Sequence, residues 1–319
     1  MLQRIREASE RALAGGQLRP IETYSIWRED YGMPFLIRQV ASLREKPHTS
    51  PSDWPTTSAE AQPAAAKLAN DTLTQSPPNN PFLPYDPAMF VADVSATHVA
   101  LLNKFPVVPN HLLVVTREFQ LQSTRLARAD FDALANCQLQ FESLGFYNSG
   151  TIAGASQPHR HLQLIPLPLT DRTDQPDPTV FPTDQSDDLN DPTDLPIDVL
   201  LLRDAPPSSA ACSSHVPFAH RWIGIPAATD AATLGTHFLS AYDRLLESVG
   251  WDEVTPQRPY NLLTTRRWMM LVPRRREAFD GISLNSMAYA GALLVRTREE
   301  LDRLCTAGPM QALIATAGL

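Results

Sequence analysis

The sequence has little cysteine, lysine or glycine, and it has no long apolar run. Its 319 residues include 3 cysteines that lie far apart without a CxxC pair, which excludes a disulfide framework and gives no sign of a CxxC metal or redox site. The 13 glycines stand against 29 prolines, and no stretch reaches the roughly 20 apolar residues that span a bilayer. Collagen-like and membrane-spanning classes are therefore excluded, and we expect a soluble globular protein with no membrane partner.

The charge balance is acidic, with a net charge of −8. A chain of this kind lacks the positive surface of a general nucleic-acid binder, so we expect no nucleic-acid partner. The first residues mix both charge signs and lead into no apolar segment, which predicts no secretory signal and a cytoplasmic location. Of the 27 basic residues only Lys46, Lys67 and Lys104 are lysines, which suggests that a lysine kept here serves as a compact positive charge.

Apolar periodicity and turn residues divide the chain into helices and strands. Helices are predicted at residues 1–16, 126–144, 233–249 and 298–304, with Gly145 as the stop of the second. Strands are predicted at residues 33–40, 89–92, 99–102, 111–116, 162–167, 260–263 and 268–272. This mixture indicates an α+β fold with a largely antiparallel sheet flanked by helices.

A segment rich in Asp, Pro and Thr separates two halves of the chain. Residues 171–198 are too polar to bury much surface, so we interpret them as a flexible excursion. We therefore predict an N-terminal catalytic region at residues 1–170 and a C-terminal region at residues 199–319. Residues 47–66, between prolines, are predicted to be mostly loop.

The strongest chemical signal is the run Gly154-Ala-Ser-Gln-Pro-His-Arg-His-Leu-Gln163. Alternate residues of a strand share a face, so His159, His161 and Gln163 are expected on the same side. The turn before them offers N–H and hydroxyl donors for phosphate oxygens. A neutral imidazole, held in one tautomer by a hydrogen bond, is a capable nucleophile toward phosphorus.

Two other interpretations of the histidine pair stay open at this point. Imidazole is also the commonest metal ligand, and Cys212, His215 and His220 are the suppliers of further ligands nearest in the sequence. The two histidines could also be structural. The spacing alone does not decide among nucleophile, metal ligand and core residue.

Several stretches of the chain resemble one family, the diadenosine tetraphosphate phosphorylases (ATP adenylyltransferases). This is a branch of the histidine triad superfamily related to galactose-1-phosphate uridylyltransferase. In the first half the resemblance is carried by residues 103–113, 144–150 and 154–163. In the second half it is carried by residues 260–263, 268–274, 283–286 and 291–296, which the small histidine triad hydrolases lack. The resemblance implies a histidine-triad-like fold whose C-terminal region extends the same kind of sheet.

The resemblance also implies a reaction and a set of catalytic residues. His161 is expected to attack the α-phosphorus of diadenosine tetraphosphate and expel ATP, leaving an adenylyl-histidine that inorganic phosphate resolves to ADP. His159 is expected to orient His161 through its backbone carbonyl, and Gln163 to hold the transferring phosphate. The partners are thus ATP, ADP, inorganic phosphate and diadenosine tetraphosphate, with no tightly bound cofactor and with Mg²⁺ accompanying the polyphosphate.

Further residues are expected to contact the substrate, by the same resemblance. They include Lys46 for the distal phosphates, the amides of the Gly154–Ala155 turn, and Asn148 for ribose or the α-phosphate. The expected set is Lys46, Asn103, Lys104, Asn148, Gly154, Ala155, Ser156, Gln157, Asn285, Ser286, Met287 and Arg296. The alternatives are a uridylyl- or adenylyltransferase with a sugar phosphate or adenylyl sulfate as acceptor, and a non-catalytic dinucleotide sensor.

Two short arginine runs, at residues 266–267 and 274–276, stand near the end of the chain. They could neutralise phosphates of a second nucleotide. Short charge runs usually form solvated faces, so we expect both runs to be exposed.

Overall fold

The computed structural model describes residues 1–41, 76–77, 79–169, 194–251 and 258–318. An eight-stranded sheet forms its centre, and every neighbouring pair in this sheet is antiparallel. In spatial order its strands are β3 (Phe90–Asp93), β4 (His98–Leu102), β5 (Leu112–Thr116), β7 (His161–Pro166), β6 (Ser143–Asn148), β9 (Tyr260–Thr264), β10 (Trp268–Pro273) and β8 (Arg221–Gly224). The sheet thus begins with strands of the first half of the chain and continues into strands of the second.

The pairing of β6 with β9 joins the two halves of the sheet. In this register Gly145 lies opposite Thr264 and Asn148 lies opposite Asn261. The fold class predicted from the sequence, an α+β protein with a largely antiparallel sheet that the C-terminal region extends, is confirmed.

A smaller, three-stranded sheet brings the beginning and the end of the chain together. It consists of β1 (Thr23–Asp30), β2 (Met33–Val40) and β13 (Ala292–Val295), and β13 runs parallel to β2. A short hairpin of β11 (Ala278–Phe279) and β12 (Ile282–Ser283) precedes β13.

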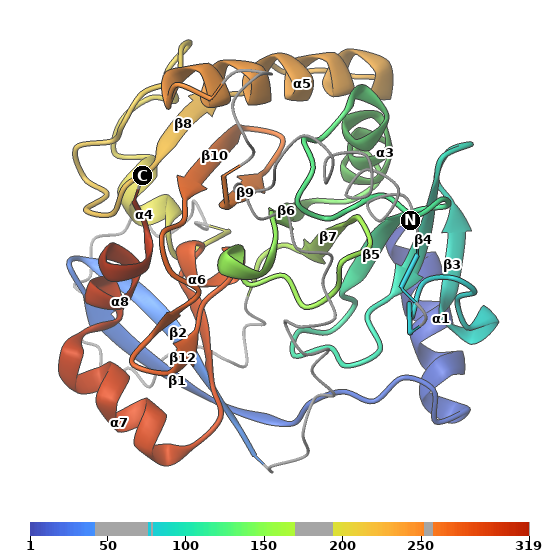
Figure 1. Ribbon diagram of the computed structural model, residues 1–319, viewed down its shortest axis with the longest axis horizontal. Coiled ribbons are helices and arrows are strands. Elements are labelled where there is room, and N and C mark those ends of the chain that lie inside the picture. Colours follow the sequence, from blue (N-terminus) through green and yellow to red (C-terminus); the bar gives the residue numbers. More distant parts are fainter. Residues whose placement is uncertain (42–75, 78, 170–193, 252–257, 319) are drawn as a thin grey trace, which may run out of the picture.

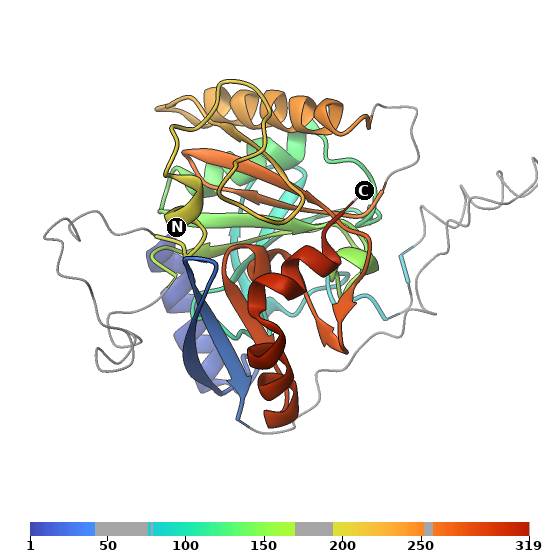
Figure 2. The ribbon, with the colours of Figure 1, turned by 90° about the vertical axis from the view of Figure 1, so that its left-hand side faces the viewer.

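Helices cover both faces of the large sheet. On one face α1 (Leu2–Ala14), α3 (Arg128–Gln138) and α5 (Ala231–Ser248) bury one core, in which Leu162 and Leu164 of β7 take part. On the other face α6 (Ser286–Tyr289), α7 (Arg298–Ala307) and α8 (Pro309–Thr316) pack with the small sheet in a second core. Figure 2 shows α5 above the large sheet and the small sheet with α7 and α8 below it. The short helices α4 (Asp198–Leu201), η2 (Pro87–Met89) and η3 (Thr151–Ala153) lie in connections.

One predicted helix was wrong at its C-terminal end. The helix expected at 126–144 stops at Gln138, and residues 143–148 form the central strand β6. The reason is the packing of Gly145, where an added Cβ would lie 3.0 Å from the Leu134 side chain and 3.1 Å from that of Thr264. Gly145 therefore permits a close approach inside the sheet instead of ending a helix.

The predicted polar excursion falls partly outside the described residues, as do Lys46 and the predicted loop at 47–66. The described end of the excursion, from residue 194, belongs to the folded body, because Leu195 and Ile197 are fully buried. These two apolar side chains correct the predicted boundary at residue 198. No helix within the described ranges is long and apolar enough to cross a membrane.

Candidate active site

His161 is the first residue of β7, near the middle of the large sheet (Figure 1). It pairs with Val115 of β5, and its side chain is 4% exposed. Its Nδ1 lies 2.8 Å from the backbone carbonyl of His159. A carbonyl can only accept, so Nδ1 carries the proton and Nε2 carries the lone pair. Burial lowers the pKa of His161 from 6.5 to about 4, which keeps the ring neutral.

His159 is fully buried and both of its ring nitrogens have partners. Its Nε2 donates to the backbone carbonyl of Thr116 at 2.8 Å, and its Nδ1 accepts from the Asn80 amide at 2.8 Å. Burial lowers the pKa of His159 to about 4 as well. Its ring is thus occupied by the protein, and the atom that it presents to His161 is the backbone oxygen, as expected from the sequence.

Two phenylalanine rings surround the histidine pair. The Phe82 ring centroid lies 5.6 Å from that of His159 and 5.4 Å from that of His161. The Phe119 centroid lies 5.4 Å from that of His159. Apolar rings at these positions contribute to the burial that lowers the pKa values of the imidazoles.

Gln163 lies two residues beyond His161 and belongs to a chain of polar contacts. Its Oε1 lies 3.0 Å from Nε2 of His111, and Nδ1 of His111 lies 3.1 Å from the Asn103 amide. The amide of Asn103 donates, so His111 accepts at Nδ1 and donates from Nε2 to Gln163. The structure therefore connects two of the predicted site residues through His111, which sequence reasoning had not singled out.

Asn148 is buried at the end of β6 and holds a residue of the C-terminal region. Its Oδ1 accepts from Ser286, from the hydroxyl at 2.7 Å and from the backbone N–H at 3.0 Å. It also accepts from the Asn261 amide at 2.8 Å. Asn261 in turn binds the Ala153 carbonyl at 2.8 Å and accepts from Arg274 at 2.6 Å. Two of the predicted contact residues, Asn148 and Ser286, are thus brought together although 138 positions separate them.

The turn at Gly154 packs directly against the start of α6. Gly154 has a φ of +86°, and an added Cβ would lie 2.7 Å from the carbonyl oxygen of Leu284 and 2.8 Å from Cβ of Asn285. Asn285 caps α6 by accepting from the Met287 N–H at 3.0 Å. Glycine is required here both by the backbone conformation and by the close approach.

The expectation that the turn amides hold phosphate needs a correction. The N–H of Gly154 donates to Thr151 at 2.8 Å, and that of Ala155 donates to Gly150 at 3.1 Å. Both N–H groups thus bond to carbonyls of the turn itself, because buried backbone groups must be hydrogen-bonded, and they are not available to phosphate. Two side-chain atoms nearby, the Ser149 hydroxyl and Oε1 of Gln157, are buried without a hydrogen-bond partner among the described residues. Ser149 is a candidate contact that sequence reasoning missed.

The remaining predicted contacts are exposed or fall outside the described ranges. Lys104 is exposed in the turn after β4, with Nζ 5.8 Å from the centre of the Phe105 ring. Ser156 is exposed, and Arg296 is exposed just after β13, on the small sheet and not on the sheet that carries His161. Lys46 is not among the described residues.

The arginine run at 274–276 is not wholly exposed, which corrects the prediction. Arg274 is 3% exposed, and its guanidinium donates to the carbonyls of Leu284 and Glu277 as well as to Asn261. It can be buried because backbone and amide oxygens receive its protons. Arg267, in the other run, is half exposed and pairs with Asp198 at 3.4 Å.

Arg160, between the two histidines, contacts the helix side of the sheet. Its Nη1 lies 3.0 Å from Oδ2 of Asp130, whose Oδ1 lies 3.1 Å from Nε2 of His98. All three side chains are buried. This ion cluster fixes the backbone of the His159–His161 segment to α3 from the face opposite the imidazoles.

Comparison with known proteins decides the family. Residues 1–180 match the model of the Ap4A phosphorylase N-terminal domain, and residues 214–318 match that of the ATP adenylyltransferase C-terminal domain. The chain belongs to the Ap4A phosphorylase family. Ap4A is diadenosine tetraphosphate, so the family inferred from the sequence motifs is confirmed.

Two yeast proteins and a crystal structure illustrate the family. Protein APA1 of Saccharomyces cerevisiae is 28% identical over 315 residues, covering 92% of this chain and 86% of the relative. Diadenosine 5',5'''-P1,P4-tetraphosphate phosphorylase 2 of the same yeast is 29% identical over 287 residues, covering 81% and 80%. The crystal structure of yeast Ap4A phosphorylase Apa2 superposes with a TM-score of 0.69 at 24% identity, over 99% of this chain and 93% of that chain. The last likeness concerns the fold.

The metal interpretation of the histidine pair finds no support in this member of the family. His220 donates from Nδ1 to Phe218 at 2.9 Å and accepts at Nε2 from the Ser213 N–H at 2.9 Å, so both ring nitrogens are used. His215 lies 3.5 Å from Asp204. In the part of the chain that the structure describes, no three His, Cys, Asp or Glu side chains gather as a metal site would require.

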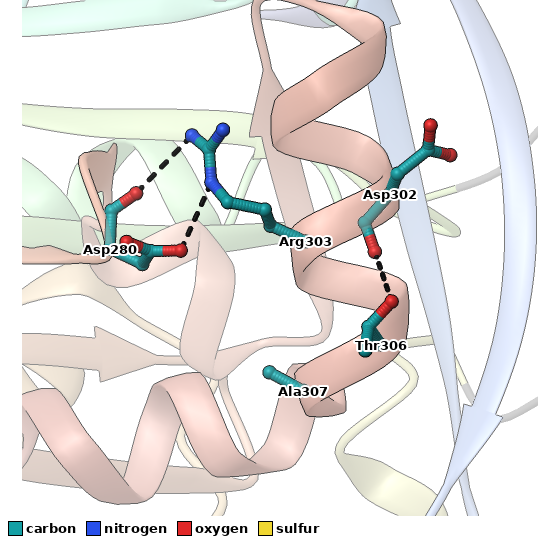
Figure 3. Close-up of a pocket in the computed structure, with 5 residues that line it drawn as sticks. All are labelled: Asp280, Asp302, Arg303, Thr306 and Ala307. Carbon is teal, nitrogen blue, oxygen red and sulfur yellow. Dashed lines mark hydrogen bonds and ion pairs between the residues drawn. The ribbon is translucent and has the colours of Figure 1, made fainter.

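A surface pocket elsewhere in this family member contains none of the predicted site residues. It lies beside α7 and is lined by Asp280, Asp302, Arg303, Thr306 and Ala307 (Figure 3). The guanidinium of Arg303 is already paired with Asp280 at 3.0 Å. Its one positive charge is thus compensated within the pocket, and we assign no ligand to it.

Proposed function

We propose that this protein catalyses the reversible phosphorolysis of Ap4A to ATP and ADP through a covalent intermediate on His161. Nε2 of His161 attacks the α-phosphorus, forming a P–N bond while the P–O bond to the leaving ATP breaks. An oxygen of inorganic phosphate then attacks the same phosphorus, which forms ADP and releases the imidazole. In each step one bond to the α-phosphorus forms and one breaks, so the adenylyl group passes from Ap4A to His161 and then to phosphate. No redox cofactor takes part.

The observation that carries the proposal is the contact between His161 Nδ1 and the His159 carbonyl. It places the proton on one nitrogen and the lone pair on the other before the substrate arrives. A nucleophile prepared in this way needs no proton removal at the moment of attack. Family membership supplies the substrate class, since the matched N-terminal domain is that of Ap4A phosphorylases.

The surrounding side chains suit a polyphosphate substrate. Gln163, on the same strand as His161, has an amide NH₂ group that can donate hydrogen bonds to the oxygens of the phosphate under attack. The Ser149 hydroxyl, which is buried without a partner in the described chain, can donate to a phosphate oxygen near the turn, whereas the buried Oε1 of Gln157 can only accept, for example from a ribose hydroxyl. Mg²⁺ enters with the polyphosphate as its counter-ion.

Residues 1–170 and 199–319 contribute different parts of the proposed site. The first region supplies the nucleophile and Asn148, whereas the second supplies Asn261 and Ser286 behind them. Neither region would complete the site alone. We also propose that the protein works in the cytoplasm.

The test is incubation of the purified protein with Ap4A, with and without inorganic phosphate. Nucleotides are separated by chromatography and the intact protein is weighed by mass spectrometry. We expect an acid-labile AMP adduct without phosphate, and ATP plus ADP when phosphate is added. An adduct that only a sugar phosphate or sulfate resolves would indicate a different acceptor, and tight binding with neither adduct nor product would indicate a sensor.

The matched pair of variants is His161→Asn and His220→Asn. Both histidines are buried and donate from Nδ1 to the carbonyl two residues earlier, but Nε2 of His220 is occupied by the Ser213 N–H. We expect His161→Asn to form no adduct and His220→Asn to form it at close to the wild-type rate, provided that it folds. Turnover by His161→Asn within about tenfold of wild type would refute covalent catalysis at this residue.

A further inference from the structure

Gln122 is a fully buried glutamine whose side chain touches the backbone of the proposed nucleophile. Its Oε1 accepts from the His161 N–H at 2.8 Å, and its Nε2 donates to the His161 carbonyl at 3.2 Å. The same Nε2 donates to the carbonyl of Asn148 at 3.0 Å. One amide group therefore holds the backbones of two proposed site residues.

The position of Gln122 explains why an amide is needed there. The ladder between β6 and β7 runs from Ser143 opposite Pro166 to Phe146 opposite Gln163. Continued in the same register, it would place Asn148 opposite His161. At that point the Gln122 side chain provides the hydrogen bonds instead. The two strands are thus joined through a side chain at the end of the sheet where the proposed chemistry takes place.

The backbone around Gln122 is itself fixed beside the histidine segment. The Gln122 N–H donates to the Pro158 carbonyl at 2.7 Å, and the Arg160 N–H donates to the Gln120 carbonyl at 2.7 Å. The Tyr147 hydroxyl donates to the Gln122 carbonyl. With its backbone held at these points, the amide cannot shift without moving the whole segment.

We propose that Gln122 is a positioning residue, which fixes the nucleophile His161 relative to Asn148 and so to the phosphate that it attacks. This inference rests on the proposed function, because it assigns a purpose to the geometry of that same site. Loss of the amide leaves the His161 N–H and two carbonyls without their partner, and the strand end can then move. A displacement of the nucleophile by about 1 Å costs on the order of 100-fold in rate.

The chain contains a matched control in Gln138. It is also fully buried, and its Nε2 donates to the carbonyls of Ser143 and Thr264 at 3.0 Å each. Its Nε2 therefore joins β6 to β9 by two donated hydrogen bonds, as Nε2 of Gln122 joins β6 to β7, but at the opposite end of β6 and with no partner for its Oε1 among the described residues. A variant of Gln138 reports what the loss of such a bridge does to stability alone.

The experiment compares Gln122→Met with Gln138→Met in the full-length protein. Formation of the AMP adduct at saturating Ap4A without phosphate is followed in a single turnover, and the dissociation constant for AMP and the melting temperature are measured beside it. We expect adduct formation to slow by about 100-fold in Gln122→Met and by less than about threefold in Gln138→Met. AMP affinity should change by less than about threefold in both, because the Asn148 side chain keeps its own partners.

Equal adduct rates in the two methionine variants would overturn the inference while leaving the proposed function intact. Should Gln122→Met fail to fold, Gln122→Glu replaces it, because a carboxyl group keeps the acceptor for His161 but loses the amide donors. Its rate of adduct formation should be lower than the rates of the wild type and of Gln138→Met, by up to about 100-fold. A rate equal to that of the wild type would overturn the inference. Absence of an adduct in the wild type would refute the proposed function and this inference with it.

Discussion

The burial of His161 leads to a prediction about pH: the first half-reaction should continue in mildly acidic solution. Burial lowers the pKa of His161 from 6.5 to about 4. A base with a lowered pKa keeps its neutral form down to a lower pH. Formation of the adenylyl-histidine should therefore persist at a pH where an ordinary histidine is protonated.

The magnitude follows from the two pKa values. At pH 5.5 an imidazole with a pKa of 6.5 is about 10% neutral, whereas one with a pKa of about 4 is about 97% neutral. Moving from pH 8 to pH 5.5 should thus reduce the nucleophilic form by only a few per cent in the wild type. The same change would reduce it by about tenfold if the ring were solvated.

The assay compares variants so that the ionisation of the substrate cancels. Phe82→Ala removes a ring that packs on both histidines, whereas Phe119→Ala removes one that contacts His159. Single-turnover adduct formation is measured from pH 8 to pH 5 for each variant and divided by the wild-type rate. We expect the ratio to fall toward low pH for Phe82→Ala, by up to about tenfold at pH 5.5 and about 30-fold at pH 5, and to stay level for Phe119→Ala.

The wild-type profile relative to Phe82→Ala decides the matter. If both proteins lose activity together with an apparent pKa near 6.5, burial does not keep the nucleophile neutral, and the reasoning fails. A fall in the ratio for Phe119→Ala as large as that for Phe82→Ala would show that His159, and not His161, controls the pH dependence.

Three further outcomes concern the support of the site. Gly154→Ala should weaken AMP binding by at least about tenfold, because its Cβ would lie 2.7 Å from a backbone oxygen. The control Gly281→Ala also has a positive φ, +79°, but its Cβ would enter open space, so AMP binding should stay unchanged. Calorimetric titration with AMP measures both affinities. Asn261→Leu should raise KM for Ap4A by about 10-fold or more through loss of its hydrogen bonds, and an unchanged KM would contradict its support of the turn. Arg160→Met should lower the free energy of unfolding in urea by about 3 kcal/mol, because it leaves the buried Asp130 without its cation; a change below about 1 kcal/mol would show that the ion cluster is dispensable.

The parts of the site that depend on local pattern could be predicted from the sequence. The alternation along residues 162–167 predicted the strand that the structure has at His161–Pro166, and the spacing of two placed His161 and Gln163 on one face. The contact from His161 to the His159 carbonyl was expected from the family resemblance and not from the local pattern. A window of a few residues contains the information that alternation along a strand needs.

Contacts between distant segments could not be predicted in this way. Asn80 reaches His159 across 79 positions, and Asn261 reaches Asn148 across 113. Their partners are set by the tertiary fold, which no local periodicity encodes. The same limit explains the error at the end of the helix predicted at 126–144, where Leu144 and the stop at Gly145 suit a helix end by composition but belong to a strand that lies between two others in the fold.

The buried Arg274 shows how one such distant contact determines chemistry at the site. A guanidinium only donates, so the oxygen of Asn261 must face it, and the Asn261 amide group must face Asn148. The Asn148 oxygen then receives this amide and both donors of Ser286. What Asn148 can offer to a ligand is therefore its NH₂ group, a donor suited to a phosphate or ribose oxygen. An arginine that the sequence indicated as surface charge thus fixes the direction in which an asparagine of the proposed site donates.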